Sequence, residues 1–155
     1  MFELLNAAAL VVVGHFFCAL LIYLNHRFVF HSKLGNLPVL KNIKRLHALH
    51  HAHAYNEKRN DYILIPTKYN IVLISLIILI GIYISAWFAV GITTFSILYS
   101  RRHYEIHNND KESIFFRHHE LHHINPKYNF SGIYPFIDFI FGTGLKKNPR
   151  YRRGL

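Results

Sequence analysis

Ten histidines recur in four short stretches, at spacings that could bind metal ions. Two stretches share the pattern H-x-x-H-H, as "HALHH" at residues 47–51 and "HELHH" at residues 119–123. Two others hold one pair each, in "HRFVFH" at residues 26–31 and "HYEIH" at residues 103–107. Neutral imidazole is a good ligand for iron, zinc and copper. The candidate metal ligands are His26, His31, His47, His50, His51, His103, His107, His119, His122 and His123.

The spacing predicts which of these side chains share a face. Residues three and four positions apart lie on one side of an α-helix. Each triplet, and the pair His103 and His107, should therefore align on a helix. His26 and His31 are five positions apart, about 140° around an ideal helix. That pair needs a helix end, a bend or separate metal ions. Ten ligands exceed what one ion can take, so we expect two ions with about five histidines each.

Nearby acidic residues could orient the imidazole rings by accepting their second N–H. The candidates are Asp61, Glu105, Asp110 and Glu120. His53 and His118 flank the triplets outside the spacing, so we expect them in a supporting position or in solvent. His15 lies inside an apolar block, where a hydrogen-bonded structural role is the simpler interpretation.

Two long apolar blocks must position the histidine stretches. Residues 4–24 and 71–99 contain no Lys, Arg, Asp or Glu. Both reach the length of about 20 residues that a membrane-spanning helix needs. The first block lacks a basic leading segment and a small-residue cleavage site, so it does not resemble a signal peptide. We expect one membrane helix over the first block, continuing toward His31.

The second block is better explained as a hairpin than as one crossing. All 18 Lys and Arg lie in residues 27–68 or 101–153. Under the positive-inside rule, both basic regions should face the cytoplasm. A single crossing would also separate the histidine stretches. We therefore expect a turn near residues 81–86, and a second helix from Trp87 to His107.

The resulting expectation is a single all-α membrane domain over residues 1–155. Three membrane helices, one alone and two in a hairpin, would carry a cytoplasmic helical cap with a histidine-rich dimetal site. Helices are expected near residues 41–55 and 111–123, and the C-terminus should be cytoplasmic. The net charge of +10 is explained by this topology and by anionic lipid headgroups, so no nucleic-acid partner is expected.

The order and type of the four stretches resemble the fatty acid hydroxylase/sterol desaturase superfamily. "LNHRFVFH" is similar to the first motif of fatty acid 2-hydroxylases, and "RLHALHH", "RRHYEIHN" and "RHHELHH" are similar to the next three. The tail "NFSGIYPFIDFIFGT" is similar to the N-F-G…D-x-L-F-G-T ending of the superfamily. The resemblance covers residues 20–145. It implies an integral-membrane di-iron oxygenase with the ten histidines as ligands.

Some features depart from fatty acid hydroxylases. The chain is about the size of bacterial β-carotene hydroxylases, and "RNDYILIP" is similar to their N-D-x-Y segment. The third motif, H-x-x-x-H, instead matches fatty acid hydroxylases, and we expect no fused cytochrome b5-like domain. A fatty acyl chain is the favoured substrate, with carotenoid or sterol hydroxylation or desaturation as the alternative.

The resemblance implies oxidation of a lipid C–H bond with dioxygen as co-substrate. Two iron ions are the expected cofactors, because dioxygen activation needs a redox-active metal; zinc can replace iron in purified protein. Hydroxylation and desaturation both remain open. The chain shows no flavin, haem or nicotinamide motif, so a separate protein should donate electrons. Metal transport or sensing is the main rival, although transport usually needs polar ligands within the spans. A structural zinc site would need fewer ligands.

Overall fold

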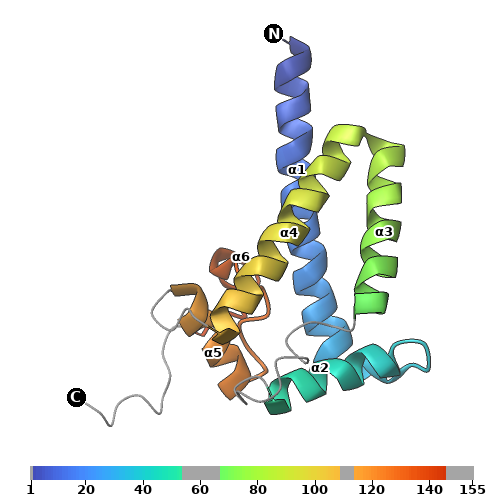
Figure 1. Cartoon of the computed structure of the whole chain (residues 1–155). Coiled ribbons are helices and arrows are strands. Elements are labelled where there is room, and N and C mark those ends of the chain that lie inside the picture. Colours follow the sequence, from blue (N-terminus) through green and yellow to red (C-terminus); the bar gives the residue numbers. More distant parts are fainter. Residues whose placement is uncertain (1, 54–66, 109–113, 146–155) are drawn as a thin grey trace.

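The computed structural model describes residues 2–53, 67–108 and 114–145, and every regular element in these ranges is a helix. Figure 1 shows the arrangement. The all-helical expectation is confirmed over these residues. The α-helices are α1 (Phe2–Asn25), α2 (Lys41–His53), α3 (Thr67–Ile84), α4 (Ala86–Asn108), α5 (Ile114–Ile124) and α6 (Pro135–Ile140). A π-helical turn, η1 (His26–Phe30), directly continues α1, and a 3₁₀ turn, η2 (Lys33–Asn36), follows it.

Helices α3 and α4 form a hairpin that breaks at Ser85, within the range where the sequence predicts a turn. The Ser85 amide still donates to the carbonyl of Gly81, at 2.8 Å. Its hydroxyl accepts from the amide of Trp87 at 3.3 Å, which satisfies one of the unpaired donors at the start of α4. A serine at this position therefore allows the chain to reverse within an otherwise apolar block.

Helices α1 and α4 cross closely because each has a glycine at the contact. A Cβ atom on Gly14 would overlap the carbonyl oxygen of Phe88. A Cβ atom on Gly91 would overlap the carbonyl oxygen of Val11. Small residues permit this approach of two backbones, as in helix pairs within membranes. The crossing places the C-terminal ends of both helices at the same end of the molecule. One histidine pair directly follows α1, and another lies in the last turns of α4.

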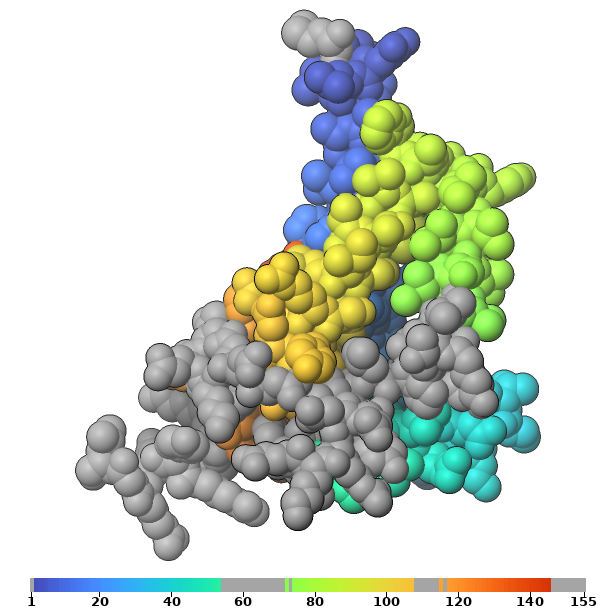
Figure 2. Space-filling model, in the orientation of Figure 1, coloured from blue at the N-terminus to red at the C-terminus, as the bar shows by residue number. Residues whose placement is uncertain are grey.

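One described helix, Phe2–Phe30, is long and apolar enough to cross a membrane by length and composition. A shorter apolar helix covers Ile74–Ile84. The first turns of α1 project beyond the hairpin, as Figure 2 shows. Apolar side chains there are exposed, including Phe2 at 80% and Leu4 at 76%.

The buried core joins α1, α4 and the segment around α6. Its members include Tyr23, Ile92, Phe95, Phe130 and Ile137. Helix α2 packs against η1 and η2, and α5 packs against α4. These two short helices lie beyond the C-terminal ends of α1 and α4 (Figure 1). The four histidine stretches therefore meet at one end of the molecule.

Candidate metal centre

The histidine side chains converge in two groups whose ring nitrogens could each hold a metal ion. The first group comprises His26, His31, His47, His51 and His122. The second comprises His50, His103, His107 and His119. Within each group the candidate ligand atoms lie within 4.8 Å of one another. The tenth predicted ligand, His123, lies beside the second group, with its Nε2 atom 3.0 Å from that of His119.

The π-turn explains how a five-residue spacing brings two histidines together. A π-helical turn closes with a hydrogen bond between residues five apart, and such turns are frequent at functional sites. The amide of His31 donates to the carbonyl of His26 at 3.2 Å. The two rings lie 5.0 Å apart between centroids, in the same group. Of the three options that the spacing left open, the structure shows a modified helix end.

Each triplet contributes to both groups. On α2, His47 and His51 belong to the first group, whereas His50 belongs to the second. On α5, His122 belongs to the first group and His119 to the second. The Nε2 atoms of His51 and His122 lie 3.1 Å apart, so the two short helices meet directly. Helices α2 and α5 therefore link the two candidate metal positions.

The distances between nitrogen atoms fit ligands around a cation. Two nitrogens bound at right angles to one ion, with metal bonds of about 2.1 Å, would lie about 3 Å apart. The Nε2 atom of His47 lies 3.1 Å from that of His26, 2.8 Å from that of His31 and 3.0 Å from that of His51. One imidazole N–H can donate only one such hydrogen bond. Three close approaches to one nitrogen therefore favour a shared metal ion.

Burial keeps the imidazoles neutral and ready to bind metal. His122, His119 and His26 are at most 3% exposed. Burial, together with the charge of Lys44, lowers the pKa of His31 to about 4. Burial and neighbouring histidines lower the pKa of His51 to about 3. The same causes hold the pKa of His47 far below its ordinary value. A neutral ring has a free nitrogen lone pair, which metal binding requires.

Backbone carbonyls, not carboxylates, orient two rings of the first group. The Nδ1 atom of His26 donates to the carbonyl of Phe130 at 2.6 Å. The Nδ1 atom of His122 donates to the carbonyl of Tyr128 at 2.7 Å. Because Nδ1 holds the proton in both rings, each Nε2 atom presents a lone pair to the group. Both carbonyls belong to the segment that follows α5.

The acidic residues expected beside the rings lie elsewhere or outside the described residues. Glu105 accepts from Arg101 at 2.8 Å and from Arg102 at 3.0 Å, so its carboxylate is paired on the surface of α4. Glu120 is half-buried on α5 and forms no hydrogen bond with a histidine among the described residues. Asp61 and Asp110 lie outside the described residues.

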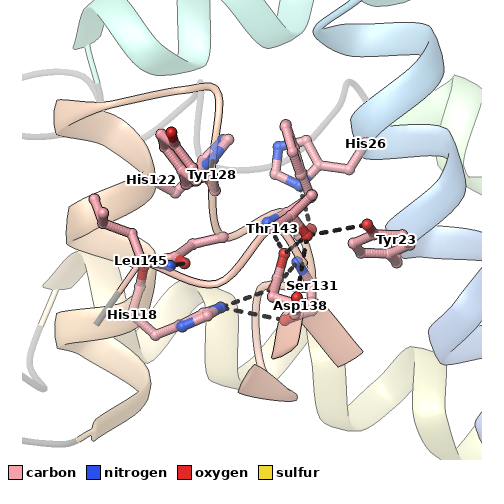
Figure 3. A network of polar contacts seen from close by, with 11 residues as sticks. Tyr23, His26, His118, His122, Tyr128, Ser131, Asp138, Thr143 and Leu145 are labelled. Atoms are coloured by element: carbon pink, nitrogen blue, oxygen red, sulfur yellow. Dashed lines mark hydrogen bonds and ion pairs between the residues drawn. The ribbon is translucent and has the colours of Figure 1, made fainter. Parts of the chain in front are cut away.

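A buried network around Asp138, drawn in Figure 3, fixes the segment that carries these carbonyls. The Asp138 carboxylate accepts from the amides of Phe130 and Ser131, at 2.7 and 2.8 Å. It also accepts from the Thr143 hydroxyl at 2.8 Å and from Nε2 of His118 at 3.0 Å. Burial acts to raise the pKa of Asp138, but these hydrogen bonds outweigh it and the pKa is lowered.

Asn129 also fixes this segment, through hydrogen bonds of its side chain to α5 and to Leu145. Its backbone has a φ of 59°, a conformation that asparagine tolerates better than most residues. Its side-chain amide donates to the carbonyl of His118 at 3.1 Å and accepts from the amide of Leu145 at 2.7 Å. Neither Asn129 nor Asp138 was among the predicted site residues. The available signal was the tail "NFSGIYPFIDFIFGT", which contains both and resembles the ending of the superfamily.

The remaining histidines lie outside both groups. His118 is 5% exposed and supports the network through Asp138, which agrees with the supporting position expected for it. His53 is half-buried in α2. His15 contacts the hydroxyl of Tyr134 through Nε2 at 2.8 Å and that of Thr94 through Nδ1 at 3.3 Å. These contacts suit the structural role expected for His15.

Comparison with known proteins identifies a family. A family model described as fatty acid hydroxylase matches residues 11–143. The matched range includes all ten candidate ligands and ends at Thr143, a member of the Asp138 network. No curated protein and no solved structure matches the chain significantly.

Proposed function

Because the chain belongs to the fatty acid hydroxylase family, we propose that it is a membrane-bound di-iron oxygenase acting on a C–H bond of a lipid. The observation that carries this proposal is the convergence of two histidine groups at one end of the α1 and α4 pair. When bound, two iron ions would supply the redox chemistry that activates dioxygen. The favoured substrate is a fatty acyl chain, with hydroxylation or desaturation as the outcome.

The residues around the site would hold and shield the metal ions. The His26 and His122 rings each use Nδ1 to bind a backbone carbonyl, which leaves Nε2 for the ion. An all-histidine set of ligands is neutral, so it leaves the positive charge of the ions uncompensated by the protein. His119 and His122 are buried, and Phe130 closes the first group with a ring 5.6 Å from that of His122. This apolar enclosure would limit access of water during oxidation.

The arrangement also suggests how a lipid would reach the site. We propose that α1 and the α3–α4 hairpin lie in the bilayer, with the histidine groups just outside its cytoplasmic face. Apolar side chains of α6 are exposed, including Phe136 at 45% and Ile140 at 71%. Phe136 lies beside Phe16 of α1, with ring centroids 6.1 Å apart. Helix α6 would thus continue the lipid-facing surface of α1 up to the metal-binding end. Electrons would come from a separate donor protein.

Mass spectrometry of host lipids tests the proposed activity. Lipids from cells that produce the protein should contain a product absent from cells that produce His47→Ala. Hydroxylation adds one oxygen atom, and growth under isotopically heavy dioxygen should label it; desaturation removes two hydrogen atoms and adds no label. Modified acyl chains would support the favoured substrate, and modified carotenoids or sterols the alternative. Identical lipid profiles, in a host shown to supply electrons to a related oxygenase, would contradict the proposal.

A further inference from the structure

Asp138 is the one acidic side chain that is buried among the described residues, at 0% exposure. It belongs to neither histidine group, so metal binding does not account for it. A buried carboxylate is costly unless charge-assisted hydrogen bonds satisfy it. Asp138 accepts four, from two backbone amides, one hydroxyl and one imidazole. Its role must therefore lie in what these donors hold in place.

The amide and carbonyl of Phe130 connect Asp138 to a candidate metal ligand. The amide donates to Oδ1 of Asp138, while the carbonyl accepts from Nδ1 of His26. Two residues earlier, the carbonyl of Tyr128 accepts from Nδ1 of His122. Asp138 thus fixes a short stretch of backbone whose carbonyls set the orientation of two imidazole rings.

Both of these rings belong to the first histidine group. Among the described residues, no hydrogen bond joins the backbone of residues 128–131 to a histidine of the second group. In His119, of the second group, the buried Nδ1 atom has no hydrogen-bond partner among the described residues. The two groups therefore differ in how their ligands are oriented.

We propose that Asp138 is a positioning residue for one of the two metal ions, the ion held by the first group. It acts through the peptide between Phe130 and Ser131, whose amide donates to Asp138 and whose carbonyl aligns His26. It also acts through the Tyr128 carbonyl, two residues earlier, which aligns His122. This inference rests on the proposed dimetal site. Outer partners of metal-binding histidines typically change metal affinity by about 10- to 100-fold. Loss of the Asp138 carboxylate should therefore weaken one metal position selectively.

Metal titration of the full chain can separate the two positions. The purified protein, stripped with a chelator and held in lipid nanodiscs, would be titrated with cobalt(II), and bound cobalt followed by absorption and elemental analysis. Two backgrounds each weaken one group: His103→Ala removes a ligand of the second group only, and His26→Ala removes a ligand of the first group only. Asp138→Asn would be placed in each background. Glu105→Gln is the matched control, because Glu105 is paired with arginines outside the network.

Asp138→Asn should weaken cobalt binding about 10- to 100-fold in the His103→Ala background and leave it unchanged in the His26→Ala background. Glu105→Gln should change neither. Equal weakening in both backgrounds, or none in either, would overturn the proposal. If Asp138→Asn unfolds, as judged by circular dichroism, Thr143→Val removes a single donor to the carboxylate and should show the same selectivity. Failure of the unsubstituted protein to bind cobalt would instead contradict the proposed dimetal site.

Discussion

The Nε2 atoms of His51 and His122 lie 3.1 Å apart, although 71 positions separate these residues in the chain. His51 comes from α2 and His122 from α5, and each helix also contributes a histidine to the second group. Nδ1 of His122 donates to the Tyr128 carbonyl, so its Nε2 atom presents a lone pair toward His51. A cation between these two nitrogens could bind both rings.

The first prediction concerns His122. Replacement by alanine removes a ligand of the first group, so lipid oxidation per folded protein should fall by more than the roughly 10- to 100-fold that loss of a ligand's outer partner costs. Iron content should fall from about two ions per chain, because one position loses a ligand. The apolar helices do not depend on this ligand, so the protein should remain folded. Product formation and elemental analysis on the same preparation provide the measurement.

Two other histidines serve as controls for His122→Ala. His15 bonds to Tyr134 and Thr94 in the helix bundle, and His53 lies outside both groups. His15→Ala and His53→Ala should retain substantial activity and their iron. Near-normal turnover in His122→Ala, or complete loss of iron in His15→Ala, would show that the ligand assignment is incorrect.

Much of the helical arrangement could be predicted from the sequence. Two charge-free blocks indicated the long helices, and the need to unite the histidine stretches indicated a hairpin, whose break lies at Ser85. The division of histidines between the groups could not be predicted. Whether His50 joins His47 or His103 depends on the angles at which the helices meet, and helical spacing alone does not determine those angles.

The His26 and His122 rings bind backbone carbonyls in place of the expected acids, and two of those acids, Asp61 and Asp110, lie outside the described residues. Acids near the motifs, such as Glu105, are the partners that a sequence indicates, because a carboxylate side chain is distinctive and a backbone carbonyl is not. The partners in the structure are carbonyls of Tyr128 and Phe130, which every residue type has. Only the buried Asp138, which fixes that backbone, has a distinctive side chain. The segment after α5 therefore supports the site through the position of its backbone carbonyls.

The second prediction concerns membrane topology. Cys18 is the single cysteine, so Cys18→Ala gives a background for labelling at introduced cysteines. Lys68→Cys near the start of α3 and Arg101→Cys near the end of α4 should both be protected from an impermeant reagent added outside intact cells. By the positive-inside rule, the positive charges near Lys68 and Arg101 predict that both ends of the hairpin face the cytoplasm. Phe2→Cys, at the opposite end of α1, should be labelled. Labelling of either hairpin position from outside would contradict the topology.

The third prediction concerns the crossing of α1 and α4. Gly14→Val would force the helices apart, because even a Cβ atom would overlap the Phe88 carbonyl. Overpacking of this kind costs about 1–3 kcal/mol, so the thermal midpoint in detergent should fall. Iron content should fall as well, since η1, which continues α1, and α4 carry ligands of different groups. Val13→Leu, at a neighbouring exposed position, should leave both quantities unchanged. An unchanged midpoint in Gly14→Val would show that the close crossing is not required.

The fourth prediction concerns acid sensitivity of the metal-free protein. The pKa values of His31 and His51 are lowered from 6.5 to about 4 and about 3. Between those values and 6.5, the unfolded chain binds more protons than the folded chain, so the free energy of unfolding must rise with pH. The stability contributed by these neutral rings is present above pH 6.5 and is lost as the pH falls toward 4.

Chelator-treated protein should accordingly unfold at a lower urea concentration at pH 5 than at pH 7.5. His31→Gln replaces one titrating ring with a neutral side chain, so the difference between the two pH values should become smaller. The comparison uses circular dichroism in one detergent at constant ionic strength, which separates proton binding from screening of the basic surface. Equal urea midpoints at both pH values would mean that solvent reaches the histidines freely in the metal-free state. That result would contradict the conclusion that His31 and His51 are buried and neutral.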